Sequence, residues 1–250
     1  MCEGRSFLRA GLLAVALLLP AGFAHCEPDS KELLESSDHA RGGELPGLMW
    51  DVAIRNSGTD ADDEVTVMRI KANSNASLGE IREPLRSKGV RILQVERNMW
   101  MSKPGLVKPV AISPRQRLTG QAAIGDIATT NYVRDYSAHY VKDDVFNNIH
   151  CHVLDLTSAT NNTTYDRIQY WVSVDQKLAV HAEFYSLSGK RLKSADFEYD
   201  NHIILQGNQF PFVSRMFISD ELTTAKTEIK YDHVVIQPVT PETFDPGNLQ

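Results

Sequence analysis

The chain has 250 residues, of which 26 are Lys or Arg and 32 are Asp or Glu, and its formal net charge is −6 at pH 7. This acidic balance argues against a general nucleic-acid binder, because contacts to phosphates need an excess of basic side chains. The length is ample for a sizeable hydrophobic core and fits one all-β domain or two small ones.

Residues 1–26 have the pattern of a secretory signal peptide. Arg5 and Arg9 give a positive start, and an unbroken apolar run follows from Gly11 to Leu19. That run is too short to cross a bilayer as a helix, which needs about 20 residues. We therefore expect cleavage of the signal peptide, which leaves a soluble chain, residues 27–250, as one domain.

The sequence has three cysteines, and Cys2 is removed with the signal peptide. Cys26 and Cys151 are the two that can matter for the mature chain. If cleavage follows Ala24, Cys26 and Cys151 can form a disulfide bond in an oxidising compartment. If cleavage follows Cys26, Cys151 is alone and is expected to be a small buried apolar residue. Both alternatives are open, and neither makes a disulfide-rich scaffold.

The first predicted element is a helix over Pro28–Gly43, with Asp29 or Ser30 as its cap. From Trp50 onward the hydrophobic pattern has a period of two, which is typical of half-buried β-strands. About eleven strands are expected. In chain order they include Trp50–Ile54, Val65–Ala72, Ser77–Glu83, Val90–Glu96, a hairpin of Val133–Lys142 and Asn148–Ser158 around Asp143-Asp144, Tyr165–Asp175, Leu178–Leu187, Arg191–Tyr199, Phe212–Ser219 and Lys226–Gln237.

The spacing of these strands and of the turns between them favours one large antiparallel sheet, curled or half-closed, in a mainly β (α+β) fold. Strands that alternate between apolar and polar residues bury one face of their sheet. Little helical sequence is available to cover that face. It is therefore either covered by Pro28–Gly43 and Gly120–Asn131 or left as a cavity. A single helical turn is predicted in the Pro-rich tail, at Pro241–Phe244.

One segment breaks the strand pattern, with the sequence NMWMSKPGLVKPVAISPRQRLTGQAAIGDI between Asn98 and Ile127. It begins as a strand at Met99–Ser102 and passes two turns that contain proline, with a short strand at Val107–Ile112. It ends in the small-residue stretch Gly120–Ile127. We predict that this stretch packs closely against the sheet as a displaceable lid.

No P-loop, dinucleotide-binding fingerprint, HExxH, CxxC or GxSxG motif occurs in the sequence. We therefore expect no enzyme and no cofactor, and we assign no catalytic residue. His150 and His152 share a face of a predicted strand, and with His139 or His181 they could bind one metal ion. Histidines on the solvent face of a strand are common, and no carboxylate is fixed beside these by spacing. No metal site is expected.

The chain resembles the LolA-like superfamily, the outer-membrane lipoprotein-sorting proteins related to LolA, LolB and RseB. The quoted segment carries most of the resemblance, and FYSLSGK, QGNQFPFVSRM and TPETFDPGNL support it. The resemblance covers essentially all of the mature chain. It implies a half-open, strongly curved antiparallel β-barrel with helices on its open side, a cavity for acyl chains or other hydrophobic ligands, and no catalytic residues.

The resemblance also implies a function. The expected protein is a periplasmic carrier or chaperone that passes a lipid or the acyl chains of a lipoprotein between membranes, or to and from an inner-membrane transporter. It is expected to be a monomer with peripheral or transient membrane contact. The chain resembles a longer branch than LolA itself, so a lipid other than a lipoprotein fits as cargo. The alternative is an RseB-like sensor or protein-interaction module of the envelope.

The apolar residues of the strands are candidates for the lining of such a cavity, although any β-domain needs similar residues for its core. Both interpretations are open. Trp100 or Met101 is expected at the opening, because these residues precede the proposed lid. The full set is Trp50, Val52, Met68, Ile70, Met99, Trp100, Met101, Ile168, Tyr170, Val172, Phe184 and Met216.

Two arginines precede the lid, Arg115 and Arg117 in the sequence PRQR. A guanidinium group can hold a phosphate or carboxylate with two parallel hydrogen bonds, so these residues are candidates for a head-group site. The alternative is a surface turn whose charges face water.

Overall fold

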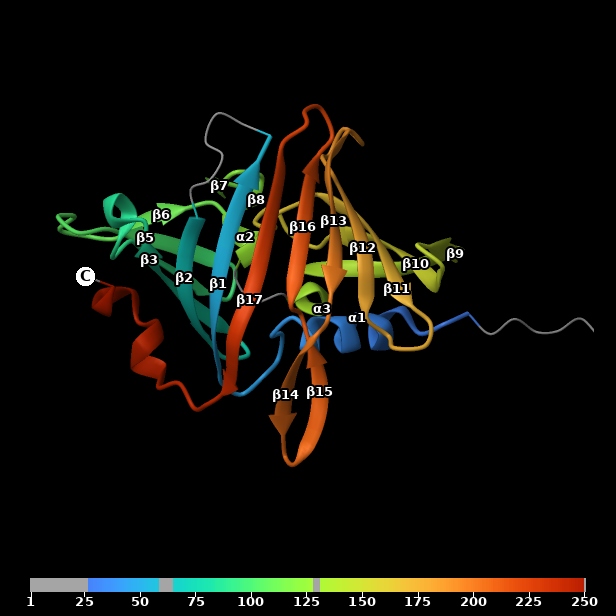
Figure 1. The fold of residues 1–250 in the computed structure, drawn as a ribbon, viewed down its shortest axis with the longest axis horizontal. Coiled ribbons are helices and arrows are strands. Elements are labelled where there is room, and N and C mark those ends of the chain that lie inside the picture. The colour runs from blue at the N-terminus through green and yellow to red at the C-terminus, as the bar shows by residue number, and fades with distance from the viewer. Residues whose placement is uncertain (1–26, 59–64, 128–130, 250) are drawn as a thin grey trace, which may run out of the picture.

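The computed structural model describes residues 27–58, 65–127 and 131–249, so the predicted signal peptide and Cys26 lie outside the described residues. The main feature is one antiparallel sheet of 13 strands whose two ends do not pair with each other (Figure 1). The prediction of a mainly β fold with one large, open antiparallel sheet is therefore confirmed. No helix within the described ranges is long and apolar enough to cross a membrane.

The sheet consists of two meanders that meet at one ladder. The first runs from β1 to the edge strand β6, and the second runs from the edge strand β9 to β17. They join where β1 pairs with β17, for example at Ile54 and Ile229. The strands are β1 (Leu48–Ser57), β2 (Val65–Ala72), β3 (Ala76–Glu83), β4 (Arg91–Val95), β5 (Asn98–Ser102), β6 (Val110–Ile112), β9 (Tyr136–Phe146), β10 (Ile149–Ser158), β11 (Arg167–Ser173), β12 (Ala179–Tyr185), β13 (Arg191–Glu198), β16 (Arg215–Asp220) and β17 (Lys226–Ile236).

Two details of the strand prediction are wrong. The turn between β9 and β10 lies at Asn147-Asn148 rather than at Asp143-Asp144. Both asparagines have a positive φ, 46° and 64°, which the tight hairpin turn requires and which Asn tolerates well. In addition, a small hairpin of β14 (Asn201–Leu205) and β15 (Asn208–Phe212) projects from the sheet between β13 and β16.

Helix α1 (Ser30–His39) confirms the predicted N-terminal helix. The Asp29 side chain accepts hydrogen bonds from the backbone N–H groups of Lys31 and Glu32, at 2.9 and 3.2 Å. These bonds satisfy two of the donors that a helix leaves free at its start. Leu33 and Leu34 are buried, so one face of the helix belongs to the core of the molecule.

The segment between the two edge strands connects opposite edges of the sheet. Because β6 and β9 are opposite edges of the sheet, the connection between them must pass from one edge to the other. It contains β7 (Arg117–Thr119), β8 (Ala122–Ala123), α2 (Ile124–Ile127) and α3 (Tyr132–Asp135), and Figure 1 shows α2 and α3 between the two halves of the sheet. We call its described parts, residues 113–127 and 131–135, the plug.

The C-terminal tail covers the other face of the first meander. It forms two short 3-10 helices, η2 (Pro241–Phe244) and η3 (Pro246–Asn248), so the predicted turn is confirmed. Phe244 and Leu249 are buried against Leu93 and Trp100, in a cluster separate from the main core. The strands near β6 are therefore covered on both faces.

Candidate ligand-binding face and its plug

The inward-pointing residues of both meanders form one continuous apolar face. All of the predicted lining residues except Trp100 and Met101 are buried there in a single cluster. Met101 is partly buried and packs against the same cluster. We call this surface the concave face. The structure therefore brings together residues from β1 to β5 and from β11, β12 and β16.

Trp100 is the exception, and its predicted position is corrected. Neighbouring residues of a strand point to opposite faces, so Trp100 cannot share a face with both Met99 and Met101. Its side chain packs with Leu93 and Phe244 under the C-terminal tail. The sequence pattern could not show this, because both faces of β5 carry large apolar residues.

The plug fills the concave face of the first meander. Leu118, Ile124 and Ile127 of the plug face Met68 and Met99 of the sheet, and the space left between them is about 20 Å³. A space of that size accommodates about one water molecule. An acyl chain can therefore occupy this part of the concave face only if the plug moves away.

The small residues of the plug fit closely, as predicted. Ala122 is fully buried, and a Cβ on Gly125 would lie 2.0 Å from Thr164 Oγ1. Gly120 has a φ of +52°, and a Cβ there would lie 1.7 Å from Asn56 Oδ1. Larger residues at these positions would force the plug off the sheet. That the plug is easily displaced stays a prediction.

A buried ion pair anchors α2 to the second meander. Lys193 Nζ lies 2.7 Å from Asp126 Oδ2, and the two side chains are 9% and 2% exposed. Tyr165 donates a hydrogen bond of 2.6 Å to Asp126 Oδ1, and Ala123 N donates one of 2.8 Å to Oδ2. Lys193 also donates to Gln121 O at 2.7 Å. Charges taken out of water need such additional partners.

A second anchor joins the plug to the ladder between the meanders. Thr227 Oγ1 of β17 donates a hydrogen bond of 2.8 Å to Asn56 Oδ1 of β1, and both residues are buried. Asn56 Nδ2 donates to Thr119 Oγ1 at 3.0 Å, and Gln121 N donates to Thr227 Oγ1 at 2.8 Å. These bonds fix the plug on both sides of Gly120.

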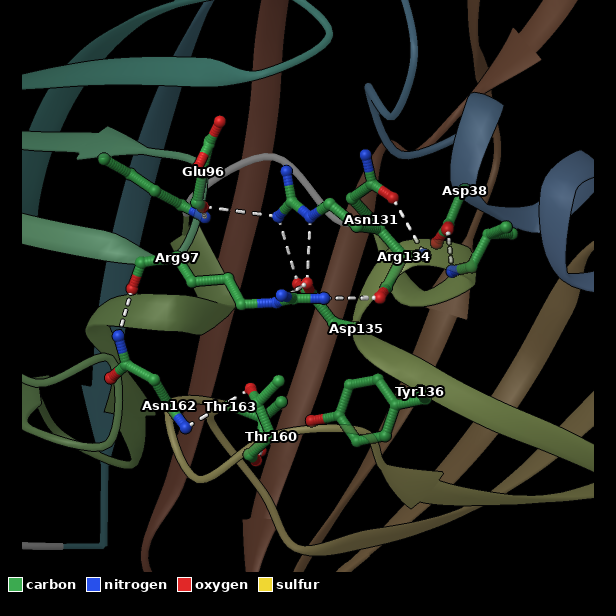
Figure 2. A network of polar contacts seen from close by, with 12 residues as sticks. Asp38, Glu96, Arg97, Asn131, Arg134, Asp135, Tyr136, Thr160, Asn162 and Thr163 are labelled. Atoms are coloured by element: carbon green, nitrogen blue, oxygen red, sulfur yellow. Dashed lines mark hydrogen bonds and ion pairs between the residues drawn. The ribbon is translucent and has the colours of Figure 1, made fainter.

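A third anchor is the network of Figure 2, which ties α3 to the turn between β4 and β5. Arg97 Nε lies 2.9 Å from Asp135 Oδ1, and Arg97 also donates to Arg134 O at 2.7 Å. Arg134 contacts both oxygens of Asp135, at 2.9 and 3.1 Å. Asn131 caps α3 by accepting a hydrogen bond from Arg134 N. These groups are only partly buried, so this anchor is the most accessible to water.

The last contact joins α3 to α1 through a buried carboxylate. Val133 N donates a hydrogen bond of 2.9 Å to Asp38 Oδ2, while Asp38 Oδ1 has no hydrogen-bond partner among the described residues. Burial raises the pKa of Asp38 from 3.8 to about 7, against the opposing effects of the Val133 hydrogen bond and the Arg41 charge. Asp38 is therefore partly protonated near neutral pH.

Arg41 lies at the same place, buried among aromatic rings. Its guanidinium carbon is 4.5 Å from the centre of the Phe197 ring and 5.5 Å from that of Tyr132 in the plug. Its hydrogen bond to Tyr170 Oη is long, 3.4 Å. Cation–π contact thus replaces much of the hydration that this charge loses on burial.

The two predicted head-group residues differ in their surroundings. Arg115 makes two hydrogen bonds to the Asp166 carboxylate, at 2.7 and 3.2 Å, which hold the pKa of Asp166 below its usual value. Arg115 also donates to Thr163 O. Arg117 is exposed, and no described residue is its side-chain partner. Both line a cavity of about 340 Å³ beside the plug, which we call the rim cavity. The head-group role stays a prediction.

The histidines considered for a metal site lie apart from this face. His152 Nδ1 lies 2.6 Å from Asp143 Oδ1, and His181 Nδ1 lies 2.5 Å from Asp196 Oδ1. His150 is exposed. Among the described residues, no group of three or more His, Cys, Asp or Glu side chains could hold a metal ion. Cys151 is buried and forms no disulfide bond with a described residue, while its predicted alternative partner Cys26 lies outside the described residues.

The charged residues that anchor the plug were not predicted from the sequence. A signal existed for Lys193, because it alternates with the inward residues Ala195 and Phe197 on β13. Asp126 is likewise the one acidic residue within Gly120–Ile127. A charge in an otherwise apolar, inward-facing pattern indicates a buried partner. The sequence does not say which residue that partner is.

Comparisons with known proteins agree with this geometry. A family model with the description "Uncharacterized protein" matches residues 73–250. A search of the curated proteins gives no match. Among solved structures, the LolA superfamily protein of Nitrosomonas europaea is 27% identical, with 88% of this chain and 98% of that chain covered and a TM-score of 0.78.

Two further structures show the same fold at lower identity. One, described as an outer membrane lipoprotein-sorting protein domain of Vibrio parahaemolyticus, is 18% identical, with 88% and 97% of the two chains covered and a TM-score of 0.73. The other, a DUF1329 family protein of Desulfovibrio piger, is 16% identical, with 88% and 98% covered and a TM-score of 0.71. The chain therefore belongs to the family whose model matches residues 73–250, and it has the fold of the LolA superfamily proteins.

Proposed function

We propose that this chain is a carrier or chaperone of the bacterial periplasm that binds acyl chains, of a lipid or of a lipoprotein, on its concave face. The observation that carries the proposal is a continuous apolar face covered by a plug that separate polar anchors hold in place. The lipoprotein-sorting description of the Vibrio relative supports it. Transfer between membranes, or to and from a transporter, would follow from reversible opening of the plug.

The energies involved are compatible with exchange between plug and ligand. Burying an acyl chain of 16 carbons gains roughly 12 kcal/mol, at about 0.8 kcal/mol per methylene. The chain replaces the apolar contacts of Leu118, Ile124 and Ile127, so the remaining cost of opening lies mainly in the polar anchors. Each neutral hydrogen bond contributes about 1 kcal/mol, and each hydrogen bond to a charged group, as in the Lys193–Asp126 anchor, about 1.5 to 3 kcal/mol. A ligand can therefore displace the plug, and the plug can return after release.

The first test is uptake itself. We expect saturable binding of a fluorescent fatty acid to the purified protein, and lipid carried through purification should be seen by native mass spectrometry. The reason is the apolar face that the plug covers. Absence of both bound lipid and saturable uptake would refute the carrier function. Recovery of a transporter from a membrane extract would favour a carrier, whereas recovery of a signalling protease would favour a sensor.

Gly120→Ala tests whether the plug limits uptake. The new Cβ would collide with Asn56 and Thr227 at a positive φ, so the second anchor should break and fatty-acid uptake should become faster. Gly105→Ala is the matched control, because Gly105 also has a positive φ, +90°, but no atom within 4 Å of the added Cβ. Stopped-flow fluorescence measures both rates. Equal rates in the two variants would show that the plug does not gate the site.

Met101→Asp tests the concave face without touching the plug anchors. Met101 is partly buried at the edge of the main core, so a carboxylate there should weaken fatty-acid binding by about tenfold or more, because the charge would lose water when a chain binds. Leu85→Asp is the control, since Leu85 is 86% exposed. Unchanged affinity of Met101→Asp in a titration, with its circular dichroism spectrum intact, would remove Met101 from the site.

A further inference from the structure

Although the chain as a whole is acidic, basic side chains outnumber carboxylates among the residues that line the rim cavity. Five basic side chains line it, against two carboxylates, those of Asp166 and Asp220; the basic residues are Arg115, Arg117, Lys190, Arg191 and Lys193. The chain as a whole has a net charge of −6. Basic groups without a carboxylate partner in a concave site can bind anions even on an acidic protein.

Two of these basic groups are available to a ligand. Arg115 and Lys193 each form an ion pair with one carboxylate, and Arg191 forms ion pairs with two, those of Glu183 and Glu221. Within the described part of the chain, the side chains of Arg117 and Lys190 have no such partner. The cavity lining therefore contains two basic groups without a carboxylate partner among the described residues, one from the plug and one from the turn between β12 and β13.

The remaining carboxylate of the lining, Asp220, is occupied by its own turn. It accepts hydrogen bonds from Leu222 N at 2.9 Å and from Thr223 Oγ1 at 3.0 Å. Asp166 is neutralised by Arg115. Neither carboxylate forms an ion pair with Lys190 or Arg117, so these two basic groups remain available to an incoming anion.

Large apolar side chains stand in water beside the same cavity. Leu187, at the tip of the β12–β13 turn, is 90% exposed, and Leu222, at the tip of the β16–β17 turn, is 72% exposed. Figure 1 shows both turns at the same end of the molecule. Leu222 lines the cavity, and Leu187 N donates a hydrogen bond to Asp166. Exposed leucines next to basic residues are the pattern of proteins that insert into a membrane interface.

We propose that this rim is a docking surface for a bilayer that contains anionic phospholipids. A lipid phosphate enters the rim cavity between Arg117 and Lys190, and Leu187 and Leu222 insert among the acyl chains. Basic residues near an anionic leaflet attract it over about a Debye length, so the attraction falls with salt. Docking goes beyond the proposed carrier function, because it does not require the plug to open.

The position of the rim connects docking with the plug. Lys193 lines the rim cavity and also forms the ion pair with Asp126 that anchors α2. Docking would therefore place the bilayer next to one of the anchors that hold the plug on the concave face. An acyl chain that leaves the concave face at this anchor would meet the membrane directly.

Flotation with lipid vesicles tests the docking surface. We expect the purified protein to bind vesicles of phosphatidylglycerol and phosphatidylcholine, and to bind less as the salt concentration rises. Arg117→Glu with Lys190→Glu should lower the partition coefficient by at least about tenfold. Lys103→Glu with Lys108→Glu makes the same change of charge in the exposed β5–β6 loop and should have little effect. Leu187→Ser with Leu222→Ser should lower binding while its salt dependence remains.

The outcomes separate docking from uptake. No binding to the anionic vesicles, or an equal loss in the two charge-reversal pairs, would overturn the docking surface. Fatty-acid uptake is measured on the same samples. Lys190→Glu alone leaves the predicted head-group residues Arg115 and Arg117 unchanged, so weaker vesicle binding with normal uptake in this variant supports the surface as a separate site. If the wild-type protein takes up no fatty acid but binds the vesicles as described, the carrier function fails and the docking surface stands.

Discussion

Replacing Lys193 with Met should lower the free energy of unfolding by about 3 to 5 kcal/mol, the largest effect that we expect from a single substitution. Lys193 is the cation nearest to the Asp126 carboxylate, whose side chain is 2% exposed. Without Lys193, Asp126 must either stay charged in a buried place or take up a proton. Both cost free energy in the folded state. Urea unfolding followed by tryptophan fluorescence measures the loss.

Two comparisons show whether this loss belongs to the ion pair. Lys193→Met combined with Asp126→Leu removes both charges and should recover much of the stability. Lys230→Met breaks the exposed pair with Asp232, at 2.9 Å, and should cost less than about 1 kcal/mol. A loss of the same size from Lys193→Met and Lys230→Met would contradict the role given to the buried pair.

Asp38→Asn should make the protein more stable above pH 7 and less sensitive to pH. The pKa of Asp38 is 3.8 in its ordinary environment and about 7 in the fold, so the folded state holds the proton more tightly. Its stabilising contribution is complete below about pH 3.8 and is lost as the pH rises through 7. Between pH 5 and pH 8 the wild type should therefore lose roughly 3 kcal/mol that the Asn variant keeps.

The substitution preserves the local geometry, because the Asn side-chain oxygen can still accept the hydrogen bond from Val133 N. The charges of Arg41 and Asp135 act on the same group and stay unchanged. Asp144→Asn is a control of opposite sign, since hydrogen bonds from Lys142 and Trp171 lower the pKa of Asp144 to about 2. The stabilising contribution of the Asp144 carboxylate is lost only as the pH falls toward that value. Between pH 5 and pH 8 the Asp144→Asn substitution should therefore leave the pH dependence of the free energy of unfolding unchanged. Equal pH profiles of wild type and Asp38→Asn would refute the assignment.

The sheet was predictable because its strands carry their own signals. The alternation of apolar and polar residues is enough to predict β2 at Val65–Ala72. The composition of Pro241–Phe244 is enough to predict the helical turn in the C-terminal tail. The face of Trp100 was not predictable, because apolar residues cover both sides of β5. Alternation locates a buried face only where the other face is polar.

The plug shows a different limit of the sequence. Its small residues predicted close packing, which the burial of Ala122 confirms. The helical structure predicted for it is found only in α2, whereas Ala122 and Ala123 form β8, because short stretches rich in Gly and Ala fit strand, turn and helix alike. Its anchors are Thr227 and Lys193, far along the chain, and only the assembled sheet brings them to Gln121. The polar half of the candidate site therefore depends on tertiary structure.

The ladder between the two meanders also sets an order of folding. It pairs Leu48 with Ile236, so the sheet is complete only after nearly the whole chain is present. The plug is made earlier than both of its main partners, Lys193 of β13 and Thr227 of β17. Contacts between residues so distant in sequence form slowly, because a long loop must close first. During that interval the first meander has its apolar face exposed, and docking of the plug is the event that ends the exposure.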